Sequence, residues 1–286
     1  MLRDLLAYVL APYPWHLAPM GYVREIAGIG RRAEQCAQSW RSLLQATKAH
    51  IARAASLRPS GGRVVVVGSG LWLDVPIKRL CAHFDHVTLV DIYHPLRVRR
   101  MARAHPKVEL VQGDITGAVK PVFDYVRRRR TGPLPEGRAG VALNGPVDLV
   151  VSVNLLSQLA VIPRRYVAAN QPSMPPHMLD DFGRSLVEGH LAWLRRAAAS
   201  AVLVTDTERE EEAADGKTVR KTILEGVTLP APDAAWSWEI APRGSVYRDI
   251  AVRHRVAAYD TLPTFEPSLS DCDRAPETPE PAADST

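Results

Sequence analysis

The chain has 286 residues, of which 46% are hydrophobic and 23% charged, a balance that is ordinary for a soluble globular protein. No apolar run approaches the roughly 20 residues that a membrane-spanning helix needs, so we expect no membrane partner. Arg3 and Asp4 interrupt the first apolar stretch and no small-residue cleavage site follows, which predicts a cytoplasmic protein without a signal peptide. The three dispersed cysteines, Cys36, Cys81 and Cys272, fit neither a disulfide framework nor a zinc site, and we expect no metal.

The net charge of +5 is unevenly distributed along the chain. Residues 261–286 contain six acidic residues, one arginine and many prolines, which predicts a disordered acidic tail. The other 260 residues carry 35 basic and 25 acidic side chains, a balance of +10 that would attract an anionic partner such as nucleic acid. The basic residues are spread over the whole chain, however, which favours an ordinary solvated surface. Nucleic acid is therefore an alternative partner and not the favoured one.

The first 60 residues predict a helical extension. Apolar residues between positions 22 and 57 recur at helical spacing, and an Arg-Pro-Ser-Gly-Gly sequence at 58–62 ends the pattern. We expect an N-terminal helical cap over residues 1–60, a cofactor-binding domain over 61–260 and the tail over 261–286. The aromatic residues of the cap would form a lid over a small acceptor or pack in an ordinary core; they are Tyr8, Tyr13, Trp15, Tyr22 and Trp40.

From residue 61 onward, strand-like and helix-like segments alternate. Strands are predicted at 64–67, 86–90, 108–112, 147–153 and 201–205, and helices at 74–83, 96–104 and 177–199. This alternation predicts an open, mostly parallel sheet. Two further strands, at 236–240 and 249–259, are joined by a connection too short for a crossover helix, so they should pair antiparallel.

Two features at the carboxyl ends of the first two strands point to a ligand site. The first strand ends in Gly68, Ser69 and Gly70, and glycines let a backbone approach a ligand closely. Asp91 lies 23 residues beyond Gly68, at the end of the next strand, where an acid can accept hydrogen bonds from both ribose hydroxyls. A purely structural turn and a capping aspartate are the alternative interpretations. The favoured one is a ribose-containing cofactor.

Four segments in sequence make the prediction more specific: VVVVGSG, HVTLVDIYH, VELVQGDIT and VDLVVSVNLLSQL. Their order resembles the motif series of class I S-adenosylmethionine-dependent methyltransferases over roughly residues 64–159. The resemblance implies an α/β fold with a Rossmann-like sheet of seven strands, the last of them antiparallel, behind the N-terminal helical extension. It also implies S-adenosylmethionine as the cofactor.

The resemblance further implies cofactor-binding roles for Gly68, Ser69, Gly70, Asp91, Asp114, Ile115 and Asn154. The glycine turn would wrap the methionine and ribose portion, and Asp91 would hold the ribose hydroxyls. Asp114, with the Ile115 backbone, would face the adenine amino edge. Asn154 would lie near the methionine end and the transferable methyl group.

Three positions depart from common patterns. Val66 stands where the family often has an acid, and Trp72 where a third glycine often follows. Asp74 would replace a missing contact to the cofactor ammonium, or cap a helix as its more ordinary role. The dinucleotide fingerprint G-x-G-x-x-G fails at Leu73, which disfavours a nicotinamide enzyme.

Methyl transfer asks mainly for positioning and exclusion of water, with a base if the acceptor is a hydroxyl or an amine. Candidate catalytic residues are Asn154, Gln158, Tyr166 and His190; the spacing of His190 equally fits a packed core histidine. Residues 154–157 do not form the motif that holds a DNA base amino group, and no Pro-Cys pair offers a nucleophile.

The sequence therefore predicts an enzyme that transfers a methyl group from S-adenosylmethionine to an oxygen or nitrogen of a small-molecule acceptor. The alternatives are an RNA methyltransferase, an NAD-dependent oxidoreductase and a non-catalytic methyltransferase-like protein.

Overall fold

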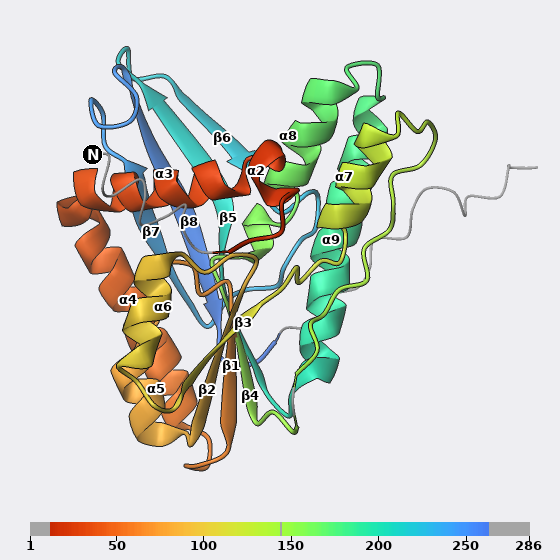
Figure 1. Ribbon diagram of the computed structural model, residues 1–286. Coiled ribbons are helices and arrows are strands. Elements are labelled where there is room, and N and C mark those ends of the chain that lie inside the picture. Colours follow the sequence, from red (N-terminus) through yellow and green to blue (C-terminus); the bar gives the residue numbers. More distant parts are fainter. Residues whose placement is uncertain (1–11, 144, 263–286) are drawn as a thin grey trace, which may run out of the picture.

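The computed structural model describes residues 12–143 and 145–262, and it has three layers, a central sheet with helices on both faces (Figure 1). Tyr8 and nearly all of the predicted acidic tail lie outside the described residues. No helix within the described part of the chain combines the length and the apolar content needed to cross a bilayer.

The sheet has the strand order β3-β2-β1-β4-β5-β8-β7, and β6 pairs with β5 beside this path. Strands β1 to β5 pair parallel where they are neighbours, whereas β8 is antiparallel to both β5 and β7. The strands are β1 (Arg63–Val67), β2 (His86–Asp91), β3 (Val108–Gln112), β4 (Leu149–Val153), β5 (Ala201–Ala213), β6 (Thr218–Thr222), β7 (Ala234–Ala241) and β8 (Ile250–Tyr259). The predicted fold class, a Rossmann-like sheet with an antiparallel last strand, is confirmed.

The valine run of β1 shows why this sheet is covered on both faces. All four residues from Val64 to Val67 are fully buried. Side chains alternate along a strand, so Val65 and Val67 enter one core and Val64 and Val66 the other. The first core contains residues of α2 (Leu17–Met20), α3 (Tyr22–Gln35), α7 (Val119–Arg127), α8 (Val161–Asn170) and α9 (Pro176–Ala197). The second contains residues of α4 (Ala37–Ser56), α5 (Ile77–His83) and α6 (Leu96–Arg103).

The N-terminal helices have two different places in the molecule. Helix α4 lies along the sheet and packs against β7, where the Trp40 indole N–H donates to the Ile240 carbonyl (3.0 Å). Helix α3 runs crosswise above the ends of β1 and β2 (Figure 1). Residues before β1 therefore share both cores with the sheet.

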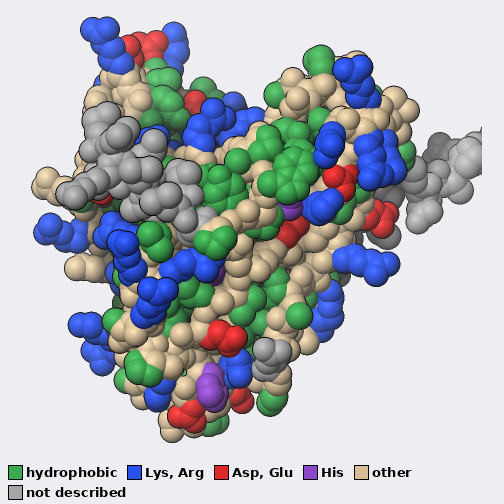
Figure 2. All heavy atoms as spheres, viewed as in Figure 1, with side chains coloured by type: hydrophobic (Ala, Val, Ile, Leu, Met, Phe, Trp, Pro, Cys, Tyr) green, Lys and Arg blue, Asp and Glu red, His purple; other side chains and the backbone are tan. Residues whose placement is uncertain are grey.

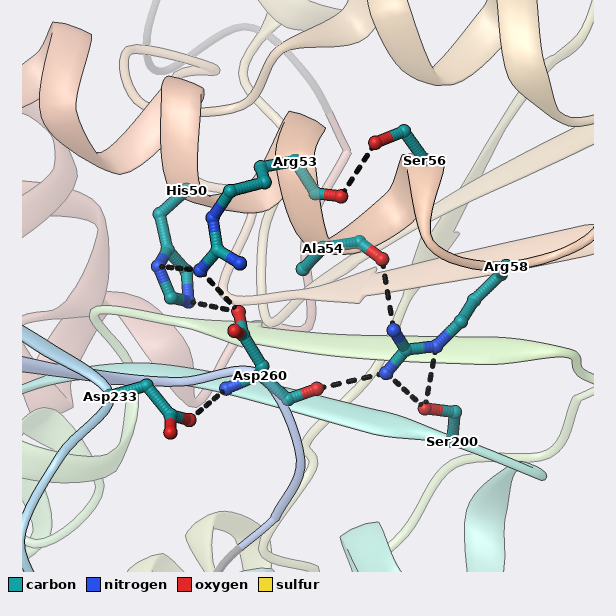
Figure 3. Close-up of polar contacts among 8 residues, drawn as sticks. All are labelled: His50, Arg53, Ala54, Ser56, Arg58, Ser200, Asp233 and Asp260. Atoms are coloured by element: carbon teal, nitrogen blue, oxygen red, sulfur yellow. Dashed lines mark hydrogen bonds and ion pairs between the residues drawn. The ribbon is translucent and has the colours of Figure 1, made fainter.

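A polar cluster fastens the end of α4 to the sheet (Figure 3). The Asp260 carboxylate lies 2.6 Å from Arg53 and 3.4 Å from His50. The Arg58 guanidinium donates to the Asp260 carbonyl (2.9 Å) and to the Ser200 hydroxyl (2.7 Å). Because these contacts join α4 to the start of β5 and the end of β8, they fix the helix that carries Trp40.

Several boundaries differ from the predicted ones. Helix α5 begins at Ile77 and not at 74, because Pro76 precedes it and residues 71–76 form a loop. Strand β5 continues to Ala213, and β6 and α8 were not predicted.

The second half of β5 pairs with β6 in a charged extension. This segment has no apolar alternation, and cross-strand ion pairs hold it instead, including Arg220–Glu210 and Arg253–Glu212 (both 2.6 Å). The pairing of β5 with β8 shifts register between Asp206 and Glu208, which marks a β-bulge.

Candidate functional site

A cavity of about 270 Å³ opens at the carboxyl ends of the parallel strands. This is the place where open α/β sheets bind ligands. Its lining includes all seven residues expected to bind the cofactor, namely Gly68, Ser69, Gly70, Asp91, Asp114, Ile115 and Asn154. Segments that are far apart in the sequence thus meet around one space.

The turn after β1 requires its first glycine for two reasons. Gly68 has a φ of +79°, which side chains other than glycine rarely adopt. A Cβ there would also lie 2.6 Å from the Val153 carbonyl oxygen and 2.7 Å from the Leu155 Cβ. At Gly70, with φ +47°, a Cβ would meet nothing closer than 3.9 Å. The turn therefore packs tightly against β4 and leaves open space beside Gly70.

Asp91 at the end of β2 contacts this turn directly. Its Oδ2 accepts a hydrogen bond from the Gly70 backbone N–H at 2.8 Å. Burial raises the pKa of Asp91, and this rise is opposed by His94 and by the Gly70 N–H. His94 is buried nearby, with its Nε2 3.1 Å from the Val111 carbonyl oxygen, and burial lowers its pKa.

Asp114 lines the cavity but is already engaged by its own loop. One carboxylate oxygen accepts from the backbone N–H (2.9 Å) and the hydroxyl (2.6 Å) of Thr116, and the other from the Val119 N–H (2.8 Å). Val119 is the first residue of α7, so the carboxylate stabilises the start of that helix. Asp114 thereby shapes the loop that presents Ile115 to the cavity.

Asp74 and Asn154 form a polar pair at another part of the wall. The Asn154 side-chain amide donates to the Asp74 carboxylate at 2.7 Å, and burial raises the pKa of Asp74. Asn154 Oδ1 is buried and has no hydrogen-bond partner among the described residues. The helix-cap interpretation of Asp74 is wrong, because α5 begins three residues later and Pro76 occupies its N-cap.

The two departures from the family pattern do not fill the cavity. Val66 and Trp72 both belong to the core between the sheet and α4–α6, and neither lines the cavity. Trp72 adopts a left-handed φ of +64° and is 6% exposed.

The candidate catalytic residues separate into two groups. Asn154 and Gln158 line the cavity, Gln158 as an exposed residue. Tyr166 stacks on Phe123 instead, with ring centroids 5.9 Å apart. His190 is fully buried with its Nε2 2.9 Å from the Ser152 hydroxyl, and burial lowers its pKa to about 3. The structure thus places Tyr166 and His190 away from the cavity.

The cap contributes to the cavity through a subset of its aromatic residues. Tyr22 and Trp40 line it, whereas Tyr13 and Trp15 do not. Burial raises the pKa of the Tyr22 phenol well above its usual value, so this group stays protonated.

Asp206 is a cavity residue that sequence reasoning missed. It lies in β5 beside the bulge, is 1% exposed, and its Oδ2 is 2.9 Å from the His254 Nδ1 of β8. Trp238 of β7 also lines the cavity. The order of β5, β8 and β7 in the sheet brings Asp206, His254 and Trp238 together. One indication of this site was present in the sequence, namely that Asp206 directly follows the strand predicted at 201–205.

Figure 2 shows how side chains of each type are distributed over one face of the molecule. Lys and Arg side chains are distributed around that face, with hydrophobic side chains across its middle. Within residues 12–143 and 145–262, no group of three His, Cys, Asp or Glu side chains is arranged to hold a metal ion.

Comparisons with known proteins give only distant structural matches. No protein-family model and no curated protein matches the sequence. Among solved structures, the DhpI–SAH complex is 15% identical (79% of this chain, 91% of that one, TM-score 0.35). The glycopeptide N-methyltransferase MtfA with S-adenosyl-L-methionine is 15% identical (75% and 78%, TM-score 0.34). The N-methyltransferase NodS from Bradyrhizobium japonicum WM9 is 14% identical (88% and 96%, TM-score 0.32). Likeness at this level carries no argument about activity, which has to come from the cavity itself.

Proposed function

We propose that this chain is an S-adenosylmethionine-dependent methyltransferase that acts on an oxygen or nitrogen of a small-molecule acceptor. The observation that supports this most is the direct contact between Gly70 and Asp91 at the wall of one cavity. A side-chain-free turn and a carboxylate from the next strand are what recognition of a ribose requires at this position.

The residues around the cavity fit the cofactor. The open space beside Gly70 would accept the ribose and methionine portion, and Asp91 would accept hydrogen bonds from the ribose hydroxyls. Ile92 and Ile115 are apolar lining residues that suit the adenine ring. Asp74, oriented by Asn154, is a carboxylate for the methionine ammonium, and Asn154 Oδ1 is a buried acceptor that still needs a donor.

When bound, S-adenosylmethionine supplies a methyl group already activated on a sulfonium, so the protein's task is chiefly positioning. Asp91 and Asp74 would fix the two ends of the cofactor. Tyr22 and Trp40, from the helices before β1, would cover the reacting end and exclude water. Because α3, α4 and β7 all contribute to the wall here, a small acceptor is favoured over a polymer.

The start of α5 argues against a nicotinamide cofactor. Dinucleotide-binding folds place the pyrophosphate at the N-terminus of the helix that follows the glycine turn. Here α5 begins at Ile77, seven residues after Gly70, and a loop lies between them. The wall of the cavity also carries five carboxylates and one guanidinium, which disfavours a pyrophosphate but suits a cationic methyl donor.

Calorimetric titration of the purified protein with S-adenosylhomocysteine and, separately, with NAD tests the proposal. We expect saturable binding of S-adenosylhomocysteine with a raised melting temperature, because a ligand of the folded state stabilises it. Binding of NAD in preference, or of neither compound, would contradict the proposal.

A further inference from the structure

Asp206 has one carboxylate oxygen that the protein leaves without a partner. Its Oδ2 lies 2.9 Å from His254 Nδ1, whereas Oδ1 is buried and has no hydrogen-bond partner among the described residues. A buried acceptor without a partner is costly, and such groups in native proteins usually await a water or a ligand. Since Asp206 belongs to the cavity wall, a ligand in the cavity is positioned to supply the donor.

His254 holds this carboxylate in place. Its Nε2 lies 3.5 Å from an Arg209 guanidinium nitrogen, which can only donate, so the tautomer that fits carries its proton on Nδ1 and donates to Asp206. The ring of His254 also packs edge-on against Trp238 at 6.1 Å. His254 is therefore a positioning residue that leaves Oδ1 as the free acceptor.

The wall around Asp206 is aromatic and lacks an available cation. Trp40 and Trp238 pack edge-to-face with centroids 5.1 Å apart, and both line the cavity. Among the lining residues that the structure describes, the cationic side chain is Arg32, which is paired with Glu25 at 2.8 Å. A buried carboxylate beside indole rings is a site for a cation, which would gain an ion pair and a cation–π contact.

Asp206 also lies close to the expected reacting end of the cofactor. Burial is the main cause of the raised pKa of Asp74, the carboxylate proposed for the methionine ammonium, and the charge of Asp206 adds a smaller contribution. Asn154, which contacts Asp74, is bonded through its backbone N–H to the Val204 carbonyl (2.8 Å), two residues before Asp206. An acceptor at Asp206 would therefore stand beside the methyl group.

We propose that the acceptor is a small amine whose nitrogen is held by Asp206 Oδ1 against Trp40 and Trp238. The inference rests on the proposed function, which left the acceptor atom as either oxygen or nitrogen, and it specifies nitrogen. In the transfer, the bound ammonium first gives one proton to Asp206 Oδ1. The lone pair of the resulting neutral amine then forms the new N–C bond, and the electron pair of the breaking C–S bond stays on sulfur as a thioether. The methylated amine leaves as an ammonium, and Asp206 releases its proton to solvent.

Three ligands that share one ring test this assignment: phenethylamine, 2-phenylethanol and phenylacetate. Each is titrated calorimetrically into the protein saturated with S-adenosylhomocysteine. We expect the amine to bind about tenfold or more tightly than the alcohol. Both can donate a hydrogen bond to Asp206, but only the ammonium adds a charge to that bond and a cation–π contact with the indole rings. Phenylacetate, which carries a negative charge, should bind weakest. In Asp206→Asn the preference for the amine should disappear. Glu210→Gln, which removes a half-buried carboxylate from the same strand at a position outside the cavity lining, should keep it.

Equal or tighter binding of the alcohol or of phenylacetate, no detectable binding of the amine, or a preference that survives in Asp206→Asn would overturn the assignment. Titration with S-adenosylhomocysteine alone reports separately on the proposed function and on the folding of each variant. Should Asp206→Asn fail to bind S-adenosylhomocysteine, Trp238→Leu takes its place. Trp238→Leu should lower the affinity for phenethylamine more than that for 2-phenylethanol. An unchanged preference for the amine would contradict the proposal.

Discussion

The backbone N–H of Gly70 donates to the Asp91 carboxylate across 2.8 Å, and this bond links the turn after β1 to the end of β2. The two residues are 21 positions apart, and the parallel pairing of β1 with β2 brings them together. The backbone N–H groups of Ile92 and Tyr93 also bond to this carboxylate, so the chain holds Asp91 in a fixed orientation at the cavity wall.

Replacing Asp91 tests the ribose contact. Asp91→Ala should weaken binding of S-adenosylhomocysteine by about 1.5–3 kcal/mol, or roughly 10- to 150-fold, because hydrogen bonds to a charged group are lost. Calorimetry provides the measurement. Asp85→Ala, at the opposite end of β2 and exposed, is the matched control and should bind normally. Unchanged affinity in Asp91→Ala would remove the ribose assignment.

Asp74 should act on the amino-acid end of the cofactor only. Asp74→Asn is expected to lower the affinity for S-adenosylhomocysteine about tenfold, because a charge-assisted hydrogen bond is lost. The same variant should bind 5′-methylthioadenosine, which lacks the amino-acid portion, like the wild type. Asp91→Ala should lower the affinity for both compounds. If Asp74→Asn lowers both affinities equally, Asp74 stabilises the loop and does not contact the ammonium.

Substitutions at two glycines with similar φ angles distinguish the cost of backbone strain from the cost of a steric clash. Gly68 and Gly216 have φ of +79° and +82°, but a Cβ would collide with β4 only at Gly68 and meets nothing within 4 Å at Gly216. Gly216→Ala should cost about 1 kcal/mol of unfolding free energy, from the left-handed backbone alone. Gly68→Ala should cost about 3 kcal/mol or more, since overpacking adds to this. Urea unfolding compares them; equal losses would mean that the turn relaxes freely.

The protein should lose stability as the pH decreases below 6.5, because His190 is buried in its neutral form. Burial lowers its pKa from 6.5 to about 3, so below pH 6.5 the unfolded chain takes up a proton that the folded protein refuses. The free energy of unfolding should therefore decrease by about 1 kcal/mol from pH 6.5 to 5.5 on account of this residue. His190→Gln, which is less stable overall, should show a correspondingly flatter profile in urea unfolding. Parallel profiles for the two proteins would show that folding does not lower the pKa of His190.

The sheet was predictable because its strands carry their own signal. Four consecutive valines fill β1 from Val64 to Val67, and β4 contains three valines and is buried along its whole length, as a strand covered on both faces requires. The predicted boundaries of β1 to β3 lie within one residue of those observed. The second half of β5 and β6 could not be found by this signal, because charge pairs and not burial hold them. Their turn at Asp215 and Gly216 was nevertheless present in the sequence as an Asp-Gly pair.

The part of the cavity wall around the glycine turn was predictable from the sequence, and the part formed by β5 and β7 was not. Gly68, Asp91 and Asn154 each end a parallel strand, so their meeting follows from the topology. Asp206 becomes part of the wall only when β8 returns antiparallel beside β5 and supplies His254. Trp238 arrives from β7, and Asp74 points into the cavity because Pro76 delays α5. These contacts depend on tertiary pairing that no local pattern contains.

The register shift at residues 206–208 divides β5 into two parts with different surroundings. Before it, β5 belongs to the buried sheet and ends at the cavity wall; beyond it, the strand joins β6 in a salt-bridged arm. Strand β8 pairs with β5 on both sides of the irregularity, so the arm is an extension of the same sheet. Its Asp215–Gly216 turn lies at the far end of that extension, and a Cβ at Gly216 would meet nothing within 4 Å. This turn is therefore the site at which we expect an affinity tag or fluorophore to be inserted without disturbing Asp206.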